Sequence, residues 1–263
     1  MLKTQTQEDA HWVNEKEYIF QKQYISDYCF ELLKNLSKTE KLIIFDIGAN
    51  IGIFTLECKK RFDGCIIHSF EPMPEPYSVL KKNVGHMKDI YINQVAIMQD
   101  DRDNRHAIYL PNYTLLSGFF VDDKDMCLLE EITELSLQKS FEKKVVEVQT
   151  RRLDSYIEHN KSTIKKIDIL KIDVEKSELE VLNSLNNMNN LSMIQYIICE
   201  IHYENYQEVK LWMIKNGFQE IYNSDVSIPK YLLNNEDVKF KRIHENNIYE
   251  KLYVVTGIFE FLH

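Results

Sequence analysis

The stretch FDIGANIGIF, from Phe45 to Phe54, constrains the fold of this chain more than any other. It follows the apolar run at residues 42–44 and precedes a segment of helical character, so it predicts a strand, a tight glycine turn and a helix start. The chain of 263 residues has only seven glycines, yet Gly48 and Gly52 lie close together here. Glycine is needed where the backbone adopts a positive φ, or where a ligand approaches the main chain. The turn is therefore expected to lie against a cofactor.

The polar residues of this turn indicate the kind of ligand. The pattern is Asp-x-Gly-x-Asn-x-Gly, with Asp46 before the first glycine and Asn50 between the two. It lacks the third glycine of the dinucleotide-binding GxGxxG turn, which counts against a nicotinamide-dependent oxidoreductase, and the chain contains no P-loop. A carboxylate and loop amides suit a ligand that has an amino-acid end and no phosphates. S-adenosylmethionine is such a ligand.

A second acid follows at the spacing that a nucleoside-binding site requires. The apolar run at residues 65–70 ends in Glu71, 25 residues after Asp46. In a strand–helix–strand unit, an acid at the end of the second strand accepts hydrogen bonds from ribose hydroxyls. Glu71 is therefore the predicted ribose ligand.

Strands and helices alternate through the first half of the chain. The patterns predict strands at 42–46, 65–70 and 90–96, and helices at 53–61 and 75–84. Such alternation is typical of a parallel, doubly wound sheet. The last two apolar segments of the chain, GFQEIY and KLYVVTG, are expected to form an antiparallel pair of strands.

Six blocks of the sequence, in order, resemble the FkbM family of class I S-adenosylmethionine-dependent methyltransferases. They read FDIGANIGIF, HSFEPMPEPYSVLKKNV, NQVAI, LDSYI, LKIDVEKSELEVL and ICEIHYE. The resemblance implies a Rossmann-like α/β fold with a doubly wound, seven-stranded, mostly parallel sheet. It implies O-methylation of a hydroxyl on a small molecule, such as a natural-product (polyketide or peptide) or sugar intermediate, with S-adenosylhomocysteine as second product. Family members usually have glycine where this chain has Lys176.

The predicted cofactor site combines the glycine turn with the strand ends beside it. The turn would hold the methionine end of the cofactor and Glu71 the ribose. Ala96, at the end of the third strand, would lie near the adenine, although a small core residue is an equal alternative. The predicted cofactor-binding residues are Asp46, Gly48, Asn50, Gly52, Phe54, Glu71, Ala96 and Asp173.

The predicted reaction centre lies where the fourth and fifth strands end. The fourth strand ends at Asp173, and the fifth ends in Glu200 and His202. Ligands of open α/β sheets bind outside the carboxyl ends of the strands. Side chains two apart on an extended segment face the same way, which groups Asp173 with Glu175 and Glu200 with His202. These four residues form the predicted catalytic set.

Within this set, His202 is the predicted general base, because its unperturbed pKa near 6.5 suits the removal of a hydroxyl proton. Two alternatives stay open. Glu175 and Glu178 could serve as ordinary acids in the first turn of a helix, and Asp173, Glu200 and His202 could bind a divalent metal ion. Metal-free catalysis ranks first, because no close-spaced ligand motif occurs.

Two further segments are expected to close the site. Residues 1–40 are predicted to form a helical cap or lid, with Tyr24 and Tyr28 over the cofactor; packing against the sheet without ligand contact is the alternative. Residues 41–263 form the predicted methyltransferase domain, in which an insertion around 97–166 is expected to build the substrate pocket. A role in core or dimer packing is an equal alternative for Ser117, Phe119 and Phe120.

Composition narrows the partners. The formal net charge of -9 opposes nucleic-acid binding, because a protein that neutralises phosphates normally has a basic face. The five cysteines are scattered without a CxxC pair, so they are expected to be thiols in a reducing cytosol. No apolar run spans a membrane and no secretory signal is recognised, which predicts a cytoplasmic protein. The expected partner is a small molecule, free or on a carrier protein, and a homodimer is open.

Two alternative functions also fit these patterns. One is an N-methyltransferase that acts on a small amine. The other is an S-adenosylmethionine-binding module without catalysis, which the lysine at position 176 motivates and the retained acids oppose.

Overall fold

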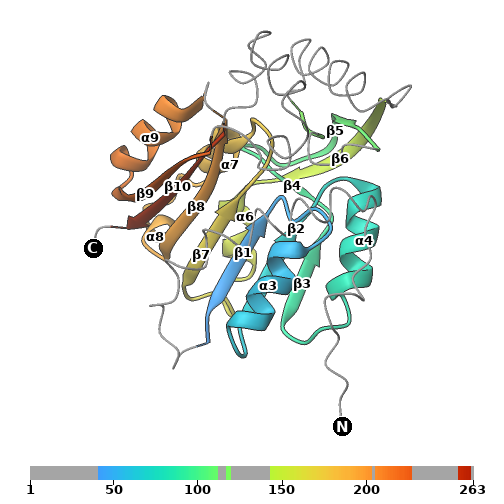
Figure 1. The fold of residues 1–263 in the computed structure, drawn as a ribbon, viewed down its shortest axis with the longest axis horizontal. Coiled ribbons are helices and arrows are strands. Elements are labelled where there is room, and N and C mark those ends of the chain that lie inside the picture. Colours follow the sequence, from blue (N-terminus) through green and yellow to red (C-terminus); the bar gives the residue numbers. More distant parts are fainter. Residues whose placement is uncertain (1–40, 112–116, 120–142, 203–204, 227–253, 262–263) are drawn as a thin grey trace, which may run out of the picture.

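The computed structural model describes residues 41–111, 117–119, 143–202, 205–226 and 254–261 (Figure 1). The predicted lid at residues 1–40, including Tyr24 and Tyr28, lies outside the described residues, as does Phe120. The described part contains a seven-stranded sheet and a separate three-stranded sheet.

The seven-stranded sheet has the order β3-β2-β1-β7-β8-β10-β9. Its first five strands are parallel, whereas β10 is antiparallel to both β8 and β9. The predicted doubly wound, mostly parallel sheet is confirmed, as is the antiparallel pair near the end of the chain. The strands are β1 (Ile43–Ile47), β2 (Ile66–Phe70), β3 (Ile90–Asn93), β7 (Ile167–Ile172), β8 (Ile194–His202), β9 (Phe218–Val226) and β10 (Val254–Phe261).

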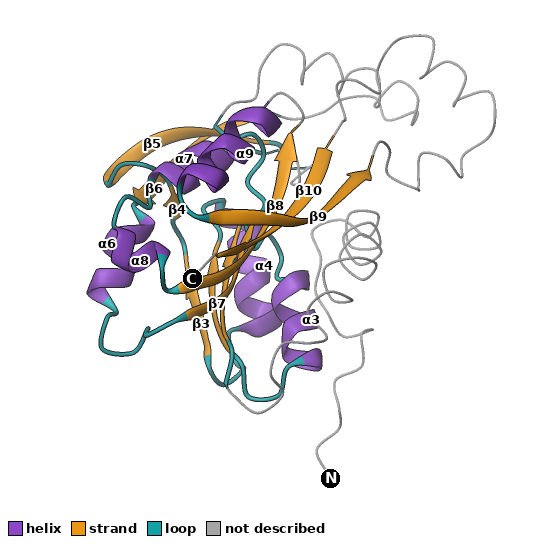
Figure 2. Cartoon of the chain, turned by 90° about the vertical axis from the view of Figure 1, so that its left-hand side faces the viewer, coloured by secondary structure: helices purple, strands orange, loops and turns teal. Residues whose placement is uncertain are grey.

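Helices cover both faces of this sheet (Figure 2). On one face, α3 packs Phe54 and Cys58 against Ile44 and its neighbours. On the other face, α6, α7 and α9 pack against Phe45 and the strands beside it. Because the central strands are buried on both faces, they are continuous apolar runs, as parallel sheets require. The helices are α3 (Ile53–Arg61), α4 (Pro74–Val84), α6 (Leu153–His159), α7 (Glu178–Asn183), α8 (Met188–Leu191) and α9 (Tyr206–Lys215).

The second sheet has the order β4-β6-β5, with bounds Ala96–Ile97, Lys144–Arg151 and Arg102–Tyr109. It packs on the loop after β2, where Met73 contacts Ala107, Tyr109 and Val148. The hydroxyl of Tyr109 also donates a hydrogen bond to Glu75. The described part of the predicted insertion therefore contributes this small sheet, beside the ends of the parallel strands, and helix α6.

The predicted third strand, 90–96, is wrong at its end. β3 stops at Asn93, and Ala96 begins β4, which pairs with β6 in the second sheet. The chain leaves the main sheet three residues earlier than the apolar pattern suggests, because Ala96 and Ile97 pair with β6 instead. The sequence RDNRHAIY of β5 is mostly polar, so it lacks the alternation of apolar and polar residues that would have predicted a strand.

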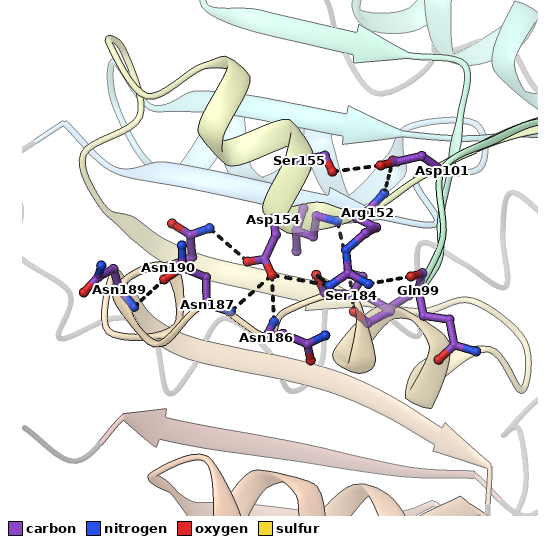
Figure 3. A network of polar contacts seen from close by, with 12 residues as sticks. Gln99, Asp101, Arg152, Asp154, Ser155, Ser184, Asn186, Asn187, Asn189 and Asn190 are labelled. Atoms are coloured by element: carbon purple, nitrogen blue, oxygen red, sulfur yellow. Dashed lines mark hydrogen bonds and ion pairs between the residues drawn. The ribbon is translucent and has the colours of Figure 1, made fainter.

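A polar network anchors the start of α6 (Figure 3). Asp154 accepts hydrogen bonds from the backbone amides of Asn186 and Asn187 at 2.7 and 3.2 Å. Its second carboxylate oxygen accepts from the side chain of Asn190 at 2.9 Å. Arg152 adds hydrogen bonds to the carbonyls of Gln99 and Ser184. The network joins α6 to the α7–α8 connection and to the strand before β5.

We expect Asp154→Ala to lower the free energy of unfolding by about 2–3 kcal/mol, because three donors lose a charged acceptor at once. Urea unfolding followed by circular dichroism measures this change. Glu158→Ala, on the same helix, is the matched control. Among the residues that the structure describes, its carboxylate pairs with exposed Lys161 alone, at 3.1 Å, so the loss should stay below about 0.5 kcal/mol. Equal losses would contradict the anchoring role of Asp154.

Candidate active site

The glycine turn lies between β1 and α3, at the carboxyl end of the sheet. Gly48, Asn50 and Gly52 adopt positive φ values of 75, 47 and 91°. The amides of Gly48 and Ala49 donate hydrogen bonds to the carbonyl of Phe70 at 3.0 and 2.9 Å. These bonds tie the turn to the end of β2, directly beside the residue predicted to bind ribose.

Both glycines are required by close contacts within the protein itself. A Cβ on Gly48 would lie 1.7 Å from the carbonyl oxygen of Asp173, and one on Gly52 would lie 2.7 Å from Cδ1 of Leu80. The positive φ values expected from the sequence are present. At Gly48 the space for a side chain is taken by the backbone at the end of β7, and at Gly52 it is taken by a side chain of α4. The turn therefore packs directly against both elements.

Glu71 braces the turn from the end of β2. Its carboxylate is 5% exposed and accepts hydrogen bonds from the amides of Asn50 at 2.9 Å and Met73 at 2.8 Å, one on each oxygen. Burial raises the pKa of Glu71 to about 7, against the opposing effect of these two amides. A carboxylate oxygen can accept more than one hydrogen bond, so this group fits a ribose diol as a further ligand.

Asp46 is fully buried and faces Lys171 across the pairing of β1 with β7. Its Oδ2 accepts a hydrogen bond from Thr55 at 2.7 Å, and its Oδ1 lies 3.2 Å from the Lys171 ammonium. With no exposed surface, Asp46 is placed to orient Lys171 and the turn. Direct contact of Asp46 with a cofactor stays a prediction.

Lys171 joins three parts of the site. Its ammonium lies 3.1 Å from Asp173, pairs with Asp46 and donates a hydrogen bond to the carbonyl of Gly48 at 2.8 Å. Burial would lower the pKa of Lys171, but the carboxylates of Asp173 and Asp46 more than reverse this effect, so the pKa is raised. Lys171 has no assigned role in the sequence analysis. A lysine inside an apolar strand, with Asp168 and Asp173 nearby in the sequence, is the signal that could have identified it.

His202, at the end of β8, lies between two carboxylates. Its Nδ1 is 2.9 Å from Glu178 Oε1, and its Nε2 is 3.2 Å from Glu175 Oε2. Burial would lower the pKa of His202, but the hydrogen bonds and charges of Glu175 and Glu178 outweigh it and raise the pKa well above its usual value. Glu178 is the first residue of α7 and is wholly buried.

Glu200 lies two residues before His202 on the same strand. Burial raises the pKa of Glu200 well above its usual value, and the charges of Asp173 and Glu175 raise it further. The structure thus brings together the four predicted catalytic residues at the ends of β7 and β8. The predicted reason for grouping Asp173 with Glu175 is wrong, however. Glu175 has a φ of 46°, so the segment after β7 is a turn and not extended.

Two predicted cofactor ligands lie in the protein interior. Phe54 is 2% exposed and packs in the core cluster beneath α3, with the Lys171 ammonium 5.8 Å from its ring centroid. Ala96 is 6% exposed and starts β4. Contact of either residue with a cofactor stays a prediction. In the insertion, Ser117 accepts a hydrogen bond from the Leu110 amide and Phe119 packs on the second sheet.

The lysine at position 176 has a left-handed backbone with φ 65°, next to the left-handed Glu175. This conformation explains why glycine suits the position, because other residues lose about 1–2 kcal/mol there. The turn nevertheless forms with lysine, and the Lys176 amide donates a hydrogen bond to Glu178 at 3.1 Å.

We expect Lys176→Gly to be more stable than Lys176→Ala by about 1 kcal/mol, because both variants lack the side chain and only glycine accepts the left-handed backbone freely. Urea denaturation measures the difference. The same pair of substitutions at Lys81, inside α4, should give the opposite order by about 1 kcal/mol. An alanine variant at 176 that matched or exceeded the glycine variant would contradict the assigned backbone geometry.

Within the described ranges, no group of three His, Cys, Asp or Glu side chains is arranged to hold a metal ion. Cys58, Cys65 and Cys199 are buried free thiols, as expected for the cysteines in this part of the chain. Among the helices that the structure describes, none has the length and apolar character needed to cross a membrane.

Comparison with known proteins gives one family and several relatives. The family model described as "Methyltransferase FkbM domain" matches residues 46–222. The 31-O-demethyl-FK506 methyltransferase FkbM of Streptomyces tacrolimicus is 30% identical over 173 residues, which cover 61% of this chain and 65% of the relative. The methyltransferase sdnD of Sordaria araneosa is 29% identical over 65% of this chain and 70% of its own length.

A third relative is much longer. The AMB antimetabolite synthetase AmbE of Pseudomonas aeruginosa is 25% identical over 72% of this chain, and the match covers 10% of that protein. The chain thus spans less than two thirds of the length of FkbM and a small part of AmbE.

Proposed function

Because the chain belongs to the FkbM family of methyltransferases, we propose that it transfers a methyl group from S-adenosylmethionine to a hydroxyl of a small molecule. One structural observation carries this proposal. The braced glycine turn and Glu71 adjoin the acidic ends of β7 and β8, which supports a nucleoside site beside titratable side chains. Ligands of open α/β sheets bind at this edge.

The residues present fit the cofactor at one point, because the carboxylate of Glu71 suits the ribose. The amides of Gly48, Ala49 and Asn50 already donate to Phe70 and Glu71, so they brace the turn, and contact of the turn with the amino-acid end stays a prediction. S-adenosylmethionine supplies an electrophilic methyl group on a sulfonium sulfur when it is bound. The chain's own task is then to align the acceptor oxygen in line with that methyl group and to take up the proton. Asp173, Glu175, Glu200 and His202 border this reaction centre.

The acceptor class follows from the relatives. FkbM is named for a substrate that lacks a methyl group on an oxygen, and AmbE is named as a synthetase of an antimetabolite. These names support a hydroxylated natural product as the acceptor. A sugar intermediate and attachment to a carrier protein are further forms of the acceptor that the proposal includes.

N-methylation of a small amine is the second candidate. The observation that favours it is the excess of carboxylates over cations at the ends of β7 and β8, which would attract an ammonium group. Methyl-position analysis of the product by nuclear magnetic resonance separates the two reactions, because O-methyl and N-methyl carbons have distinct shifts.

Calorimetric titration tests the cofactor first. Micromolar binding of S-adenosylmethionine and S-adenosylhomocysteine, with no binding of NAD, is the expected result. Turnover with hydroxylated acceptors, free and carrier-bound, then tests the reaction. Binding of NAD alone would refute the proposal, and cofactor binding without turnover of any acceptor would favour a module without catalysis.

The raised pKa of Glu71 makes cofactor binding depend on pH. The carboxylate is ionised above its pKa of about 7 and protonated below it. The dissociation constant should therefore rise by up to about tenfold as pH falls from 8 to 6, because the neutral acid accepts hydrogen bonds less well. Glu71→Gln should weaken binding at pH 8 by about ten- to a hundredfold and flatten this dependence.

Calorimetry at pH 6, 7 and 8 measures both effects. Comparison with the glutamine variant separates Glu71 from the titration of the ligand's own amino group. Glu158→Gln, on the exposed face of α6, is the control and should behave as the unsubstituted protein. Equal pH slopes in the protein with and without Glu71 would contradict the assignment.

A further inference from the structure

We propose that Glu200, and not His202, takes the proton from the acceptor, while His202 is a fixed cation that positions Glu175 and Glu178. This inference rests on the proposed function and assigns different roles to Glu200 and His202 within the same site.

With Glu175 and Glu178 ionised, the surroundings of His202 disfavour both neutral forms of its ring. A ring without a proton on Nδ1 would point a lone pair at Glu178 Oε1 from 2.9 Å. A ring without a proton on Nε2 would point a lone pair at Glu175 Oε2 from 3.2 Å. Each arrangement sets two acceptors against each other. The doubly protonated ring donates to both carboxylates, so it has no lone pair with which to accept a proton.

Glu178 is held too firmly to turn away from the ring. It is wholly buried, and its carboxylate accepts further hydrogen bonds from the Lys176 amide at 3.1 Å and the Asn205 side chain at 3.1 Å. The Lys176 amide also points as a donor at His202 Nδ1 from 3.2 Å, which is longer than the 2.9 Å between Nδ1 and Glu178 Oε1. When the ring is protonated at Nδ1, this amide bonds to the carboxylate alone. His202 therefore ties β8 to the left-handed turn at residues 175–176 and to the start of α7.

Glu200 has the properties that His202 lacks. It lies on the same face of β8 as His202, since the two are two residues apart. Among the described residues, no donor forms a hydrogen bond with its carboxylate, so its lone pairs are available. The carboxylates of Asp173 and Glu175 and burial raise the pKa of Glu200, whereas Lys171 and His202 act in the opposite direction. A carboxylate with raised proton affinity is a suitable general base near neutral pH.

The resulting step balances. Glu200 accepts the hydroxyl proton while the acceptor oxygen forms its bond to the methyl carbon. The electron pair of the broken carbon–sulfur bond stays on sulfur. The products are the methyl ether, S-adenosylhomocysteine and a protonated Glu200, which returns its proton to solvent. His202 keeps both protons throughout, and Glu175 and Glu178 stay in place.

Nuclear magnetic resonance of the ¹⁵N-labelled protein tests the role of His202 without any acceptor. Both ring nitrogens of His202, assigned by their loss in His202→Gln, should carry protons from pH 6 to pH 8.5. Glu175→Gln should bring the titration of His202 down toward neutral pH. A His202 that is neutral at pH 7.5 in the unsubstituted protein would overturn the proposal.

Infrared difference spectra test Glu200, again without an acceptor. A protonated carboxyl band that disappears as the pH rises should be absent from Glu200→Gln and persist in Glu158→Gln. Absence of this band from the difference between the unsubstituted protein and Glu200→Gln at pH 6 would overturn the proposed base.

Kinetics with an acceptor that supports turnover complete the test. Glu200→Gln should lower kcat by about 100-fold or more, leave the dissociation constant of S-adenosylmethionine within about threefold, and remove the acidic limb of the pH profile. His202→Gln should lower kcat less and keep that limb. Loss of the limb in His202→Gln, with its retention in Glu200→Gln, would overturn the proposal. Absence of all turnover would count against the proposed function, and the spectroscopic results would still decide the state of both residues.

Discussion

Gly48→Ala is expected to lower the free energy of unfolding by at least about 3 kcal/mol and to abolish measurable binding of S-adenosylmethionine. Two costs add at this position. The backbone has a φ of 75°, which an alanine adopts only at a cost of about 1–2 kcal/mol. The new methyl group would also lie 1.7 Å from the carbonyl oxygen of Asp173. That oxygen belongs to the backbone at the end of β7, so it cannot rotate away.

Gly64→Ala is the matched control for this prediction. Gly64 has a similar φ of 67°, but the nearest atom to its added Cβ is Lys41 Cε at 3.8 Å. This variant should lose only the conformational cost and should bind the cofactor normally. Urea unfolding and calorimetry of the two variants measure both properties. Equal losses at the two glycines would show that the contact between the turn and β7 is unimportant.

Lys171→Met is expected to lower the free energy of unfolding by about 3–5 kcal/mol, because it strands two carboxylates without their cation. Lys171 is 7% exposed, and Asp46 is fully buried, so water cannot replace the ammonium at Asp46. The hydrogen bond to the Gly48 carbonyl is lost as well. Cofactor binding should weaken with it, since the turn loses its tie to β7.

A second substitution distinguishes charge imbalance from lost packing. Asp46→Asn in the Lys171→Met background should restore part of the lost stability, since no buried charge then remains at position 46. Lys161→Met, which removes an exposed ion pair with Glu158, should cost less than about 0.5 kcal/mol. A double variant no more stable than Lys171→Met alone would contradict the electrostatic explanation. Urea denaturation measures the free energy of unfolding of the unsubstituted protein, Lys171→Met, the double variant and Lys161→Met.

Local patterns in the sequence were sufficient for the main sheet and for the placement of Glu71 beside the glycine turn. The predicted helix at 53–61 has the observed bounds of α3, and the predicted helix at 75–84 differs from α4 by one residue at Pro74. Glu71 lies at the end of β2, as its spacing from the glycine turn requires. These features depend on periodicity, on turn residues and on distances of about 25 residues within one strand–helix–strand unit, all of which are visible along the chain.

The positions of the predicted catalytic residues were only partly visible in the sequence. Asp173, Glu200 and His202 could be placed at one edge of the sheet, because they lie at the ends of apolar strands, whereas the turn that carries Glu175 could not be predicted. Their protonation states could not be predicted. From its residue type, His202 is predicted to be the general base, whereas in the structure its ring lies between the carboxylates of Glu175 and Glu178.

The sequence by itself determined which residues reach the edge of the sheet, because strand periodicity and strand order place them there. Only the tertiary structure decided which of them carry charge and which contact one another. Lys171 meets Asp46 from 125 residues away in the chain, and His202 meets Glu178 across a strand and a turn. The pKa of each group depends on burial and on neighbours brought in by folding. Such interactions have no local pattern, so they emerge only when the sheet is assembled.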